Sequence, residues 1–236
     1  MAHHPKPDVL TASARVPFIF QTYPDRRQLM KVTYNGHACF SITSGNYTII
    51  LDPYSPGSVP GYGSLEESAN QVLCSHEHGD HNARDAVRII GSTASPFEIS
   101  TISTWHDDAK GKLRGPNTIH ILQAEGFTVV HLGDLGCMLT EDQIALIRRC
   151  DILLIPVGGH YTINADTAAE ITRQINAGIT IPMHYSGPGF GYDVISPVSE
   201  FLHLFSNVQV LDEPSIDLPI QNSHHITVLH AKYRTV

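Results

Sequence analysis

The segment 75–82 concentrates side chains that can bind metal ions, and it reads Ser75, His76, Glu77, His78, Gly79, Asp80, His81, Asn82. Alternate side chains on an extended backbone point the same way, so we expect His76 and His78 to bind one ion together. Gly79 permits a turn, after which Asp80 and His81 can face a second ion. Neutral imidazoles and a carboxylate suit zinc, iron or manganese. The segment therefore predicts metal chemistry.

The composition is that of an ordinary globular protein. The chain has 236 residues, of which 42% are hydrophobic and 16% charged, which fits one large α/β domain or two small ones. Its 15 histidines are roughly three times the usual share and point to metal or proton chemistry. The net charge of −8 argues against a broad surface for nucleic acid or acidic membranes.

The cysteines and the N-terminus predict a cytoplasmic protein without a membrane partner. The four cysteines form no CxxC pair and suggest no disulfide framework: Cys39, Cys74, Cys137 and Cys150. The longest apolar run near the N-terminus, 16–20, contains Pro17 and is too short for a signal peptide. No run reaches the length of a transmembrane helix. Residues 1–29 are expected to be an extension that precedes a single domain over 30–236.

Alternating apolar patterns and turn residues predict the elements that position these side chains. Strands are expected over 31–34, 38–43, 47–51, 71–75, 98–103, 118–123, 127–132, 151–157, 179–183, 208–211 and 226–230. Helices are expected over 83–90, 141–149 and 166–177, and near 197–205. Two similar halves would then pack as two sheets with helices outside. His76, Asp134 and His184 each follow an apolar strand, so we expect them to meet in one site between the halves.

A family resemblance rests on motifs that occur in a fixed order, namely Asp52 after a strand, His76-x-His78-x-Asp80-His81, His106, Gly133-Asp134 and a strand-terminal His184. In this order they resemble the metallo-β-lactamase fold superfamily, from residue 30 to residue 230. Three shorter motifs resemble those of one group within the superfamily, the compact hydrolases that include the ascorbate-6-phosphate lactonase-like proteins. They are Gly36-His37-Ala38, Pro156-Val157-Gly158-Gly159 and Pro182-Met183-His184-Tyr185.

This resemblance implies an α/β fold, an αββα four-layer sandwich of two mixed β-sheets with helices outside. It also implies two divalent ions, Zn²⁺ by preference, with Mn²⁺ or Fe²⁺ as alternatives. By position, one ion would be held by His76, His78 and His106, the other by Asp80, His81 and His184, with Asp134 bridging them. Asp52 would stand behind the ligands and orient them. For His37, a supporting role of this kind and a purely structural role fit equally.

His106 competes with two other histidines for its place among the ligands. His131 lies three residues before Asp134 on a strand, so its side chain points away by alternation. His120 lies early in a hairpin strand, where a hydrogen-bonded structural histidine is the more typical case. His106 ends a strand and is followed by two carboxylates that can orient its free ring nitrogen. The spacing therefore favours His106.

The implied mechanism is hydrolysis by a hydroxide that bridges two ions and attacks a carbonyl carbon or a phosphorus. Asp80 would also orient this nucleophile. His160 and Tyr185 are candidates for donating a proton to the leaving group. A hydrogen bond to backbone is equally open for His160, and packing is the favoured role for Tyr185. Arg114, with two lysines before it, would favour an anionic small ester, lactone or phosphoester, unless this segment is only a solvated loop.

Three other functions fit the residues less well. A nuclease or phosphodiesterase of the same fold is disfavoured by the net charge, and the 49 residues between Asp134 and His184 leave no room for a large inserted domain. A diiron enzyme is disfavoured because diiron flavoprotein relatives carry glutamate where this chain has His78. A non-catalytic, metal-stabilised binding protein would not need a bridging carboxylate. The substrate itself and the oligomeric state, a homo-oligomer included, are left open.

Overall fold

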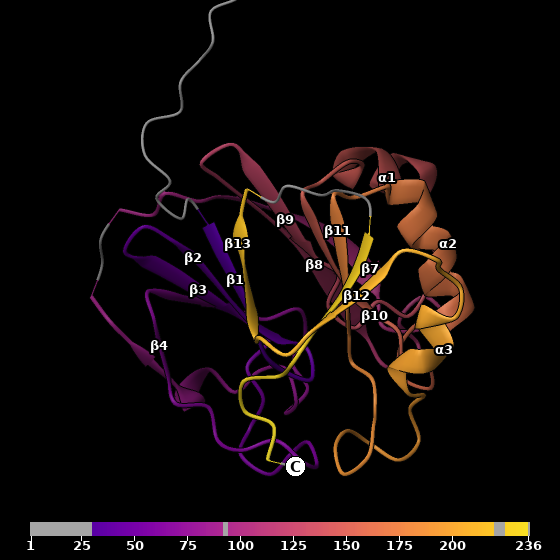
Figure 1. Cartoon of the computed structure of the whole chain (residues 1–236), viewed down its shortest axis with the longest axis horizontal. Coiled ribbons are helices and arrows are strands. Elements are labelled where there is room, and N and C mark those ends of the chain that lie inside the picture. Colours follow the sequence, from indigo (N-terminus) through magenta and orange to yellow (C-terminus); the bar gives the residue numbers. More distant parts are fainter. Residues whose placement is uncertain (1–29, 92–93, 220–224, 236) are drawn as a thin grey trace, which may run out of the picture.

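Two packed β-sheets form the centre of the computed structural model, which describes residues 30–91, 94–219 and 225–235 (Figure 1). The expected extension over 1–29 lies outside the described residues. The first sheet has the strand order β13-β1-β2-β3-β5. Its strands are β1 (Met30–Gly36), β2 (Cys39–Ser44), β3 (Tyr47–Leu51), β5 (Gln71–Leu73) and β13 (Ser215–Leu218). It is mixed, because β3 and β5 pair in parallel and the other pairs are antiparallel.

The second sheet has the order β12-β14-β11-β10-β9-β8-β7. Its strands are β7 (Glu98–Trp105), β8 (Pro116–Ala124), β9 (Phe127–His131), β10 (Ile152–Pro156), β11 (Ile179–Met183), β12 (Val208–Leu211) and β14 (His225–Leu229). The hairpin between β8 and β9 turns at Glu125 and Gly126, which adopt φ of 54° and 82°. Every residue of β10 and β11 is buried, as expected for apolar parallel strands at the centre of a sheet.

Three α-helices lie on the outer side of the second sheet: α1 (Glu141–Ile147), α2 (Ala165–Ile175) and α3 (Val198–Leu202) (Figure 1). Thr140 begins α1 with a capping box, in which its hydroxyl accepts from Gln143 N and the Gln143 side chain accepts from Thr140 N. Asn164 caps α2, and the helix ends at Asn176 in the left-handed conformation, two residues before the expected Gly178.

The helix expected over 83–90 is wrong. Arg84–Ala86 forms one 3-10 turn (η1), and β6 (Val87–Ile89) then pairs in parallel with β4 (Glu67–Ala69). Ala83 provides no side-chain cap, and β-branched residues such as Val87 and Ile89 favour extended backbone. Within the described ranges, α-helices therefore cover the seven-stranded sheet only, and the segment expected as a helix forms this short strand pair instead.

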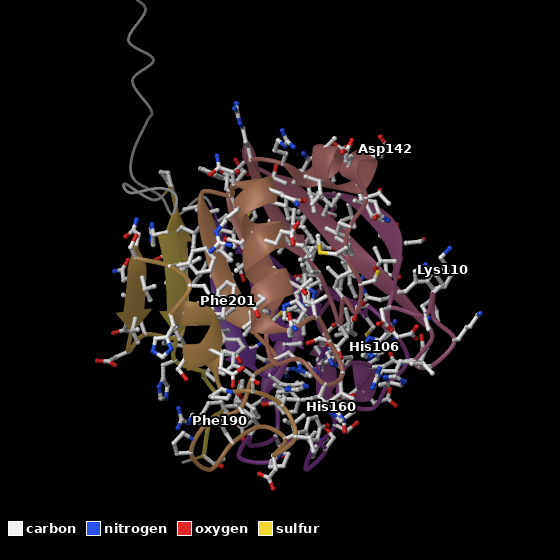
Figure 2. The ribbon with its side chains drawn as sticks, turned by 90° about the vertical axis from the view of Figure 1, so that its right-hand side faces the viewer. His106, Lys110, Asp142, His160, Phe190 and Phe201 are labelled. Atoms are coloured by element: carbon white, nitrogen blue, oxygen red, sulfur yellow. The ribbon has the colours of Figure 1, made fainter. Side chains whose placement is uncertain are left out.

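The strand directions bring several loops to one edge of the molecule. Because β8 is antiparallel to both β7 and β9, the strands β7, β9, β10 and β11 all run the same way. Their carboxyl ends, and those of β3 and β5, meet at the lower edge in Figure 1. Figure 2 shows His106 and His160 towards this end and Asp142 of α1 towards the opposite end. The side chains that follow these strands are thus brought together.

Candidate metal centre

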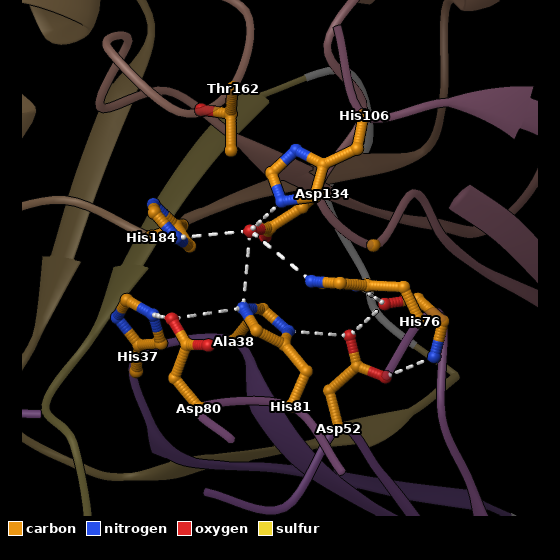
Figure 3. Close-up of polar contacts among 12 residues, drawn as sticks. His37, Ala38, Asp52, His76, Asp80, His81, His106, Asp134, Thr162 and His184 are labelled. Carbon is orange, nitrogen blue, oxygen red and sulfur yellow. Dashed lines mark hydrogen bonds and ion pairs between the residues drawn. The ribbon is translucent and has the colours of Figure 1, made fainter. Parts of the chain in front are cut away.

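Asp134 lies at the centre of a buried cluster of histidines (Figure 3). Its Oδ2 atom is 3.2 Å from His81 Nε2, 3.3 Å from His106 Nε2, 3.3 Å from His184 Nε2 and 3.9 Å from His76 Nε2. These residues follow four different strands, β5, β7, β9 and β11. One carboxylate thus faces imidazoles from several separate loops, the arrangement expected of a ligand that bridges two ions.

Close packing around Gly133 positions Asp134. Gly133 has φ of 58°, and a Cβ atom there would lie 2.4 Å from Asn117 Oδ1 and 2.5 Å from the Ser75 side chain. Asn117 fixes both sides of this glycine, because its Oδ1 accepts from Asp134 N (3.0 Å) and its Nδ2 donates to Leu132 O (2.9 Å). Only glycine fits this close approach and this backbone conformation, so the motif Gly133-Asp134 has a steric cause.

Two groups of ligand atoms lie on either side of Asp134. His76, His78 and His106 form one, and His37, Asp80, His81 and His184 form the other; within each group the ligand atoms lie within 4.8 Å of one another. The structure therefore brings together all seven residues expected as ligands. His76 and His78 lie in a bend rather than on an extended strand, with their rings edge to face at 4.6 Å. His78 is exposed, whereas His37, His81 and His184 are fully buried.

The donor set fits divalent metal ions. Several buried atoms at the centre make no hydrogen bond within the part of the chain that the structure describes: His76 Nε2, His81 Nε2, both ring nitrogens of His184, and Asp134 Oδ1. A buried polar atom without a partner is destabilising by about 1–3 kcal/mol, so such atoms are rare unless something else binds them. Their convergence on one point, and their nitrogen and oxygen chemistry, match zinc, manganese or iron.

Asp52 orients the ring of His81. Its Oδ1 accepts from Ser75 N (2.6 Å), and its Oδ2 accepts from Ser75 Oγ (2.6 Å) and His81 Nδ1 (2.9 Å). Burial opposes ionisation, but the hydrogen bond from His81 and the other polar contacts outweigh it and lower the pKa of Asp52 to about 2. The carboxylate therefore leaves His81 Nε2 free to face Asp134, the usual arrangement behind a metal-binding histidine.

Ser75 is a site residue that the sequence did not reveal. Its hydroxyl donates to Asp52 Oδ2 and lies 2.9 Å from His76 Nδ1, which can donate to it. Asp52 therefore orients His81 directly and His76 through Ser75. A serine directly before the histidine motif was the only available signal, and serine is common in any loop.

The charges in the metal-free cluster are arranged around Asp134. Burial favours neutral Asp134, but the nearby His184 and His81 outweigh it and lower the pKa of Asp134 well below its usual range. Burial likewise opposes protonation of His81, but Asp134 and Asp52 raise the pKa of His81 well above its usual value. Burial lowers the pKa of His76 to about 4. The cluster therefore holds negative carboxylates that a cation can neutralise.

Backbone strain collects at this centre. His37, Asp52 and His184 adopt φ of 55°, 45° and 53°, the left-handed region that side chains other than glycine rarely adopt. Each such residue costs of order 1–3 kcal/mol unless the surrounding structure compensates for it, and such residues cluster at functional sites.

Asp80 is held by a residue that the sequence reasoning missed. The hydroxyl of Tyr192 lies 3.2 Å from Asp80 Oδ2 and 3.0 Å from Ser58 O, and it can donate to either. The Tyr192 ring stands edge to face with Tyr161 at 5.9 Å, and the Arg114 guanidinium lies 5.6 Å from the centre of the Tyr161 ring. A connected set of side chains thus leads from the cluster to the loop of Arg114.

The two residues expected to donate protons are placed differently from the ligands. His160 is exposed and its ring packs edge to face on Tyr161 at 4.5 Å. Tyr185 is buried and packs on Phe190 at 5.9 Å. Burial raises the pKa of Tyr185, which makes it a poor proton donor. Within the described residues, neither side chain makes a hydrogen bond or an ion pair with Asp134.

The histidines that competed with His106 have structural partners. His131 Nε2 bonds to Ala38 O (2.9 Å), and His131 Nδ1 accepts from Gly133 N (3.1 Å). His120 Nε2 bonds to Cys74 O (3.2 Å).

The four cysteines are free. In the described residues, no helix has the length and apolar character needed to cross a membrane.

Comparison with known proteins gives a consistent result. Residues 31–184 match the family model described as a beta-lactamase superfamily domain. A UPF0173 metal-dependent hydrolase of Thermoplasma volcanium is 30% identical over 190 residues, which cover 66% of this chain and 84% of the relative. One of Pyrococcus furiosus is 28% identical over 193 residues, covering 67% and 85%.

Two solved structures extend this comparison. A protein of Thermotoga maritima, described as a candidate zinc-dependent hydrolase of the metallo-beta-lactamase superfamily, is 32% identical with a TM-score of 0.68, covering 85% of this chain and 98% of the other. A candidate metal-dependent hydrolase of Parabacteroides distasonis is 18% identical with a TM-score of 0.59, covering 86% and 93%, and shows the fold alone. The expected α/β fold of the metallo-β-lactamase type is therefore confirmed, except that the described α-helices lie outside only one of the two sheets.

Proposed function

The chain belongs to the beta-lactamase superfamily, and from this premise we propose that it is a binuclear metal-dependent hydrolase acting on a small, anionic ester, lactone or phosphoester. One observation carries the proposal, the buried Asp134 carboxylate with imidazole nitrogens of four residues within 3.9 Å of its Oδ2. The two groups of ligand atoms beside it support two ions rather than one. The names of the relatives, which are metal-dependent hydrolases, support the reaction class.

When bound, two divalent ions lower the pKa of a water molecule towards neutrality and stabilise the negative charge that develops on the substrate. The residues of the chain create the conditions for this chemistry. Asp52 and Ser75 fix the rings of His81 and His76, so the ligand geometry does not depend on the ions alone. Zinc fits best, because five of the seven proposed ligands are imidazoles.

Asp80, one of the proposed ligands, is also the proposed group that orients the attacking water molecule. Although burial opposes ionisation, contact with His37 and the charge of His81 lower the pKa of Asp80, so it is a carboxylate at neutral pH. Its side chain keeps 18% of its surface accessible, whereas Asp134 keeps only 2%. Asp80 can therefore accept a hydrogen bond from an attacking water molecule at the boundary between the buried cluster and the solvent, and so orient it.

Metal removal and return test this function. We expect protein purified without chelator to contain two ions per chain, and chelator to abolish turnover that zinc or manganese then restores. The substrate panel should contain carboxylic esters, lactones, phosphomonoesters and a phosphodiester. One iron per chain with oxygen consumption would contradict hydrolysis. Two ions without turnover of any substrate would favour a non-catalytic binding protein, and turnover of the phosphodiester alone would favour the phosphodiesterase reading.

Arg114 is the proposed contact for the anionic group of the substrate. Its loop is rigid, because the buried Asp107 carboxylate accepts from Gly111 N (2.9 Å), Leu113 N (3.0 Å) and Arg114 N (2.7 Å). The Tyr161 ring beneath the guanidinium restricts it further. A fixed guanidinium, joined to Asp80 through the contacts of Tyr161 and Tyr192, suits a phosphate or a carboxylate.

We expect Arg114→Met to raise KM for an anionic substrate by about 10-fold or more, because a charge-assisted hydrogen bond contributes about 1.5–3 kcal/mol. The kcat should change little, since Arg114 lies outside the cluster. Steady-state kinetics with an anionic substrate and its neutral analogue measure the effect. Lys112→Met is the matched control, because Lys112 is an exposed cation two residues before Arg114. Equal losses for both substrates would contradict a role in anion binding.

A further inference from the structure

His37 occupies a strained and fully enclosed position. It is buried, its φ is 55°, and its carbonyl oxygen accepts from Tyr34 Oη (3.0 Å) and from His184 N (2.9 Å). A glycine would adopt this backbone without cost, whereas a histidine is strained there. The histidine side chain must therefore contribute something that offsets the strain.

The ring of His37 packs among the proposed ligands, and neither of its nitrogens makes a hydrogen bond within the described ranges. The ring centre lies 4.1 Å from that of His184 and 5.4 Å from that of His81. A buried nitrogen without a partner is rare in proteins unless something else binds it.

The separation between His37 Nε2 and Asp80 Oδ2, 3.4 Å, indicates what this ring does. An N–H···O hydrogen bond usually spans about 2.7–3.2 Å. Two atoms bound to one zinc ion at about 2.1 Å, at angles of about 90–120°, are instead about 3.0–3.6 Å apart. The distances from Asp134 Oδ2 to His81, His106 and His184, 3.2–3.3 Å, are similar. The spacing of His37 and Asp80 thus matches two ligands of one ion better than a hydrogen bond.

We propose that His37 is an additional ligand of the ion held by Asp80, His81 and His184, an inference that rests on the proposed two-metal function. The four ligand atoms lie within 4.8 Å of one another. With Asp134 this ion would have five protein ligands, against four for the ion at His76, His78 and His106. Since His78 is exposed, the two ions are unequal. The buried ion is the tightly held one, and the exposed ion keeps room for the substrate.

His37→Asn tests the proposal, because asparagine tolerates the left-handed backbone but is too short to replace the imidazole. Titration with a chelator, followed by metal analysis, should remove the ions of the wild type in two separate steps. In the variant we expect the later step to shift to about 10–100-fold weaker binding and the earlier step to remain unchanged. Circular dichroism should show an unchanged fold. An unchanged second step would overturn the proposal.

Nitrogen NMR of histidine-labelled protein separates a ligand from a neighbour that only positions Asp80. On adding zinc to the metal-free wild type, the His37 nitrogen should move to the range of metal-bound imidazole, and this signal should be missing in His37→Asn. The nitrogens of His131, which bond to backbone, are the internal reference that should not move. If two ions bind and the His37 signal stays, only this inference fails. If zinc moves no histidine signal, the proposed function fails as well.

Discussion

Replacing Asp134 by asparagine is expected to reduce metal-dependent turnover by at least about 10³-fold, which corresponds to about 4 kcal/mol of lost transition-state stabilisation. Bound metal should fall from two ions to at most one per chain. Asparagine keeps the shape of the side chain and its backbone contact with Asn117. It loses the negative charge that faces His81, His106 and His184, and a neutral amide oxygen is a much weaker ligand for two ions. Metal analysis and kinetics on the same preparation measure both effects.

Glu77→Gln is the matched control, because Glu77 is an acidic residue within the histidine motif but is exposed and accepts a hydrogen bond from Asn82. We expect it to keep both ions and nearly full turnover. If Asp134→Asn kept two ions and more than a tenth of the activity, a bridging role for Asp134 would be wrong. The two proposed sites would then have to be independent of each other.

The elements that the sequence predicts best are those with a local physical signal. The turn at Glu125-Gly126, the cap at Thr140 and the apolar run of β10 each depend on residues that are close in the chain. The gathering of the candidate ligands was predictable for a related reason. Parallel strands place their carboxyl ends at one edge, so residues that follow such strands meet there.

The features that escaped prediction depend on partners far away in the chain. The stretch 83–90 contains no strong helix start, and its pairing with β4 decides that it is extended. Tyr192 lies in a loop without periodicity, and its contacts with Ser58 and Asp80 span more than a hundred residues. The strained backbone of His37 and His184 contradicts local preference, so no local rule can reveal it.

Asp52→Asn is expected to lower the stability of the folded protein by about 3–5 kcal/mol, because it removes one partner from a buried, fully bonded ion pair. Asp52 has no exposed surface and accepts from two groups of Ser75 and from His81. Asparagine tolerates the φ of 45° at this position, so backbone strain should not contribute. Chemical denaturation of metal-free wild type and variant measures the difference. Ser75→Ala, which removes one of the three donors, should cost about 1 kcal/mol.

The same substitution should change how stability depends on pH. The pKa of Asp52 is about 2 in the folded chain against 3.8 normally, so its ionisation stabilises the fold by about 2 kcal/mol at neutral pH. Because the folded-state pKa is depressed, this contribution is complete above pH 4 and is lost as the pH falls towards 2. The variant lacks it, so the stability difference between the two proteins should narrow over this range. A constant difference down to pH 2 would contradict the assigned ionisation.

Asp52→Asn should also lower the affinity for metal by about 10–100-fold, because the asparagine amide reverses the direction of the hydrogen bond with His81. Asp52 Oδ2 accepts the proton of His81 Nδ1, so Nε2, which faces Asp134, is the nitrogen that can bind a metal ion. An asparagine NH₂ group in that place would donate to Nδ1 and move the ring proton to Nε2, where no metal ion can bind. If the variant binds both ions with wild-type affinity, the metal itself must choose the tautomer of His81, and the carboxylate behind the ring would serve stability alone.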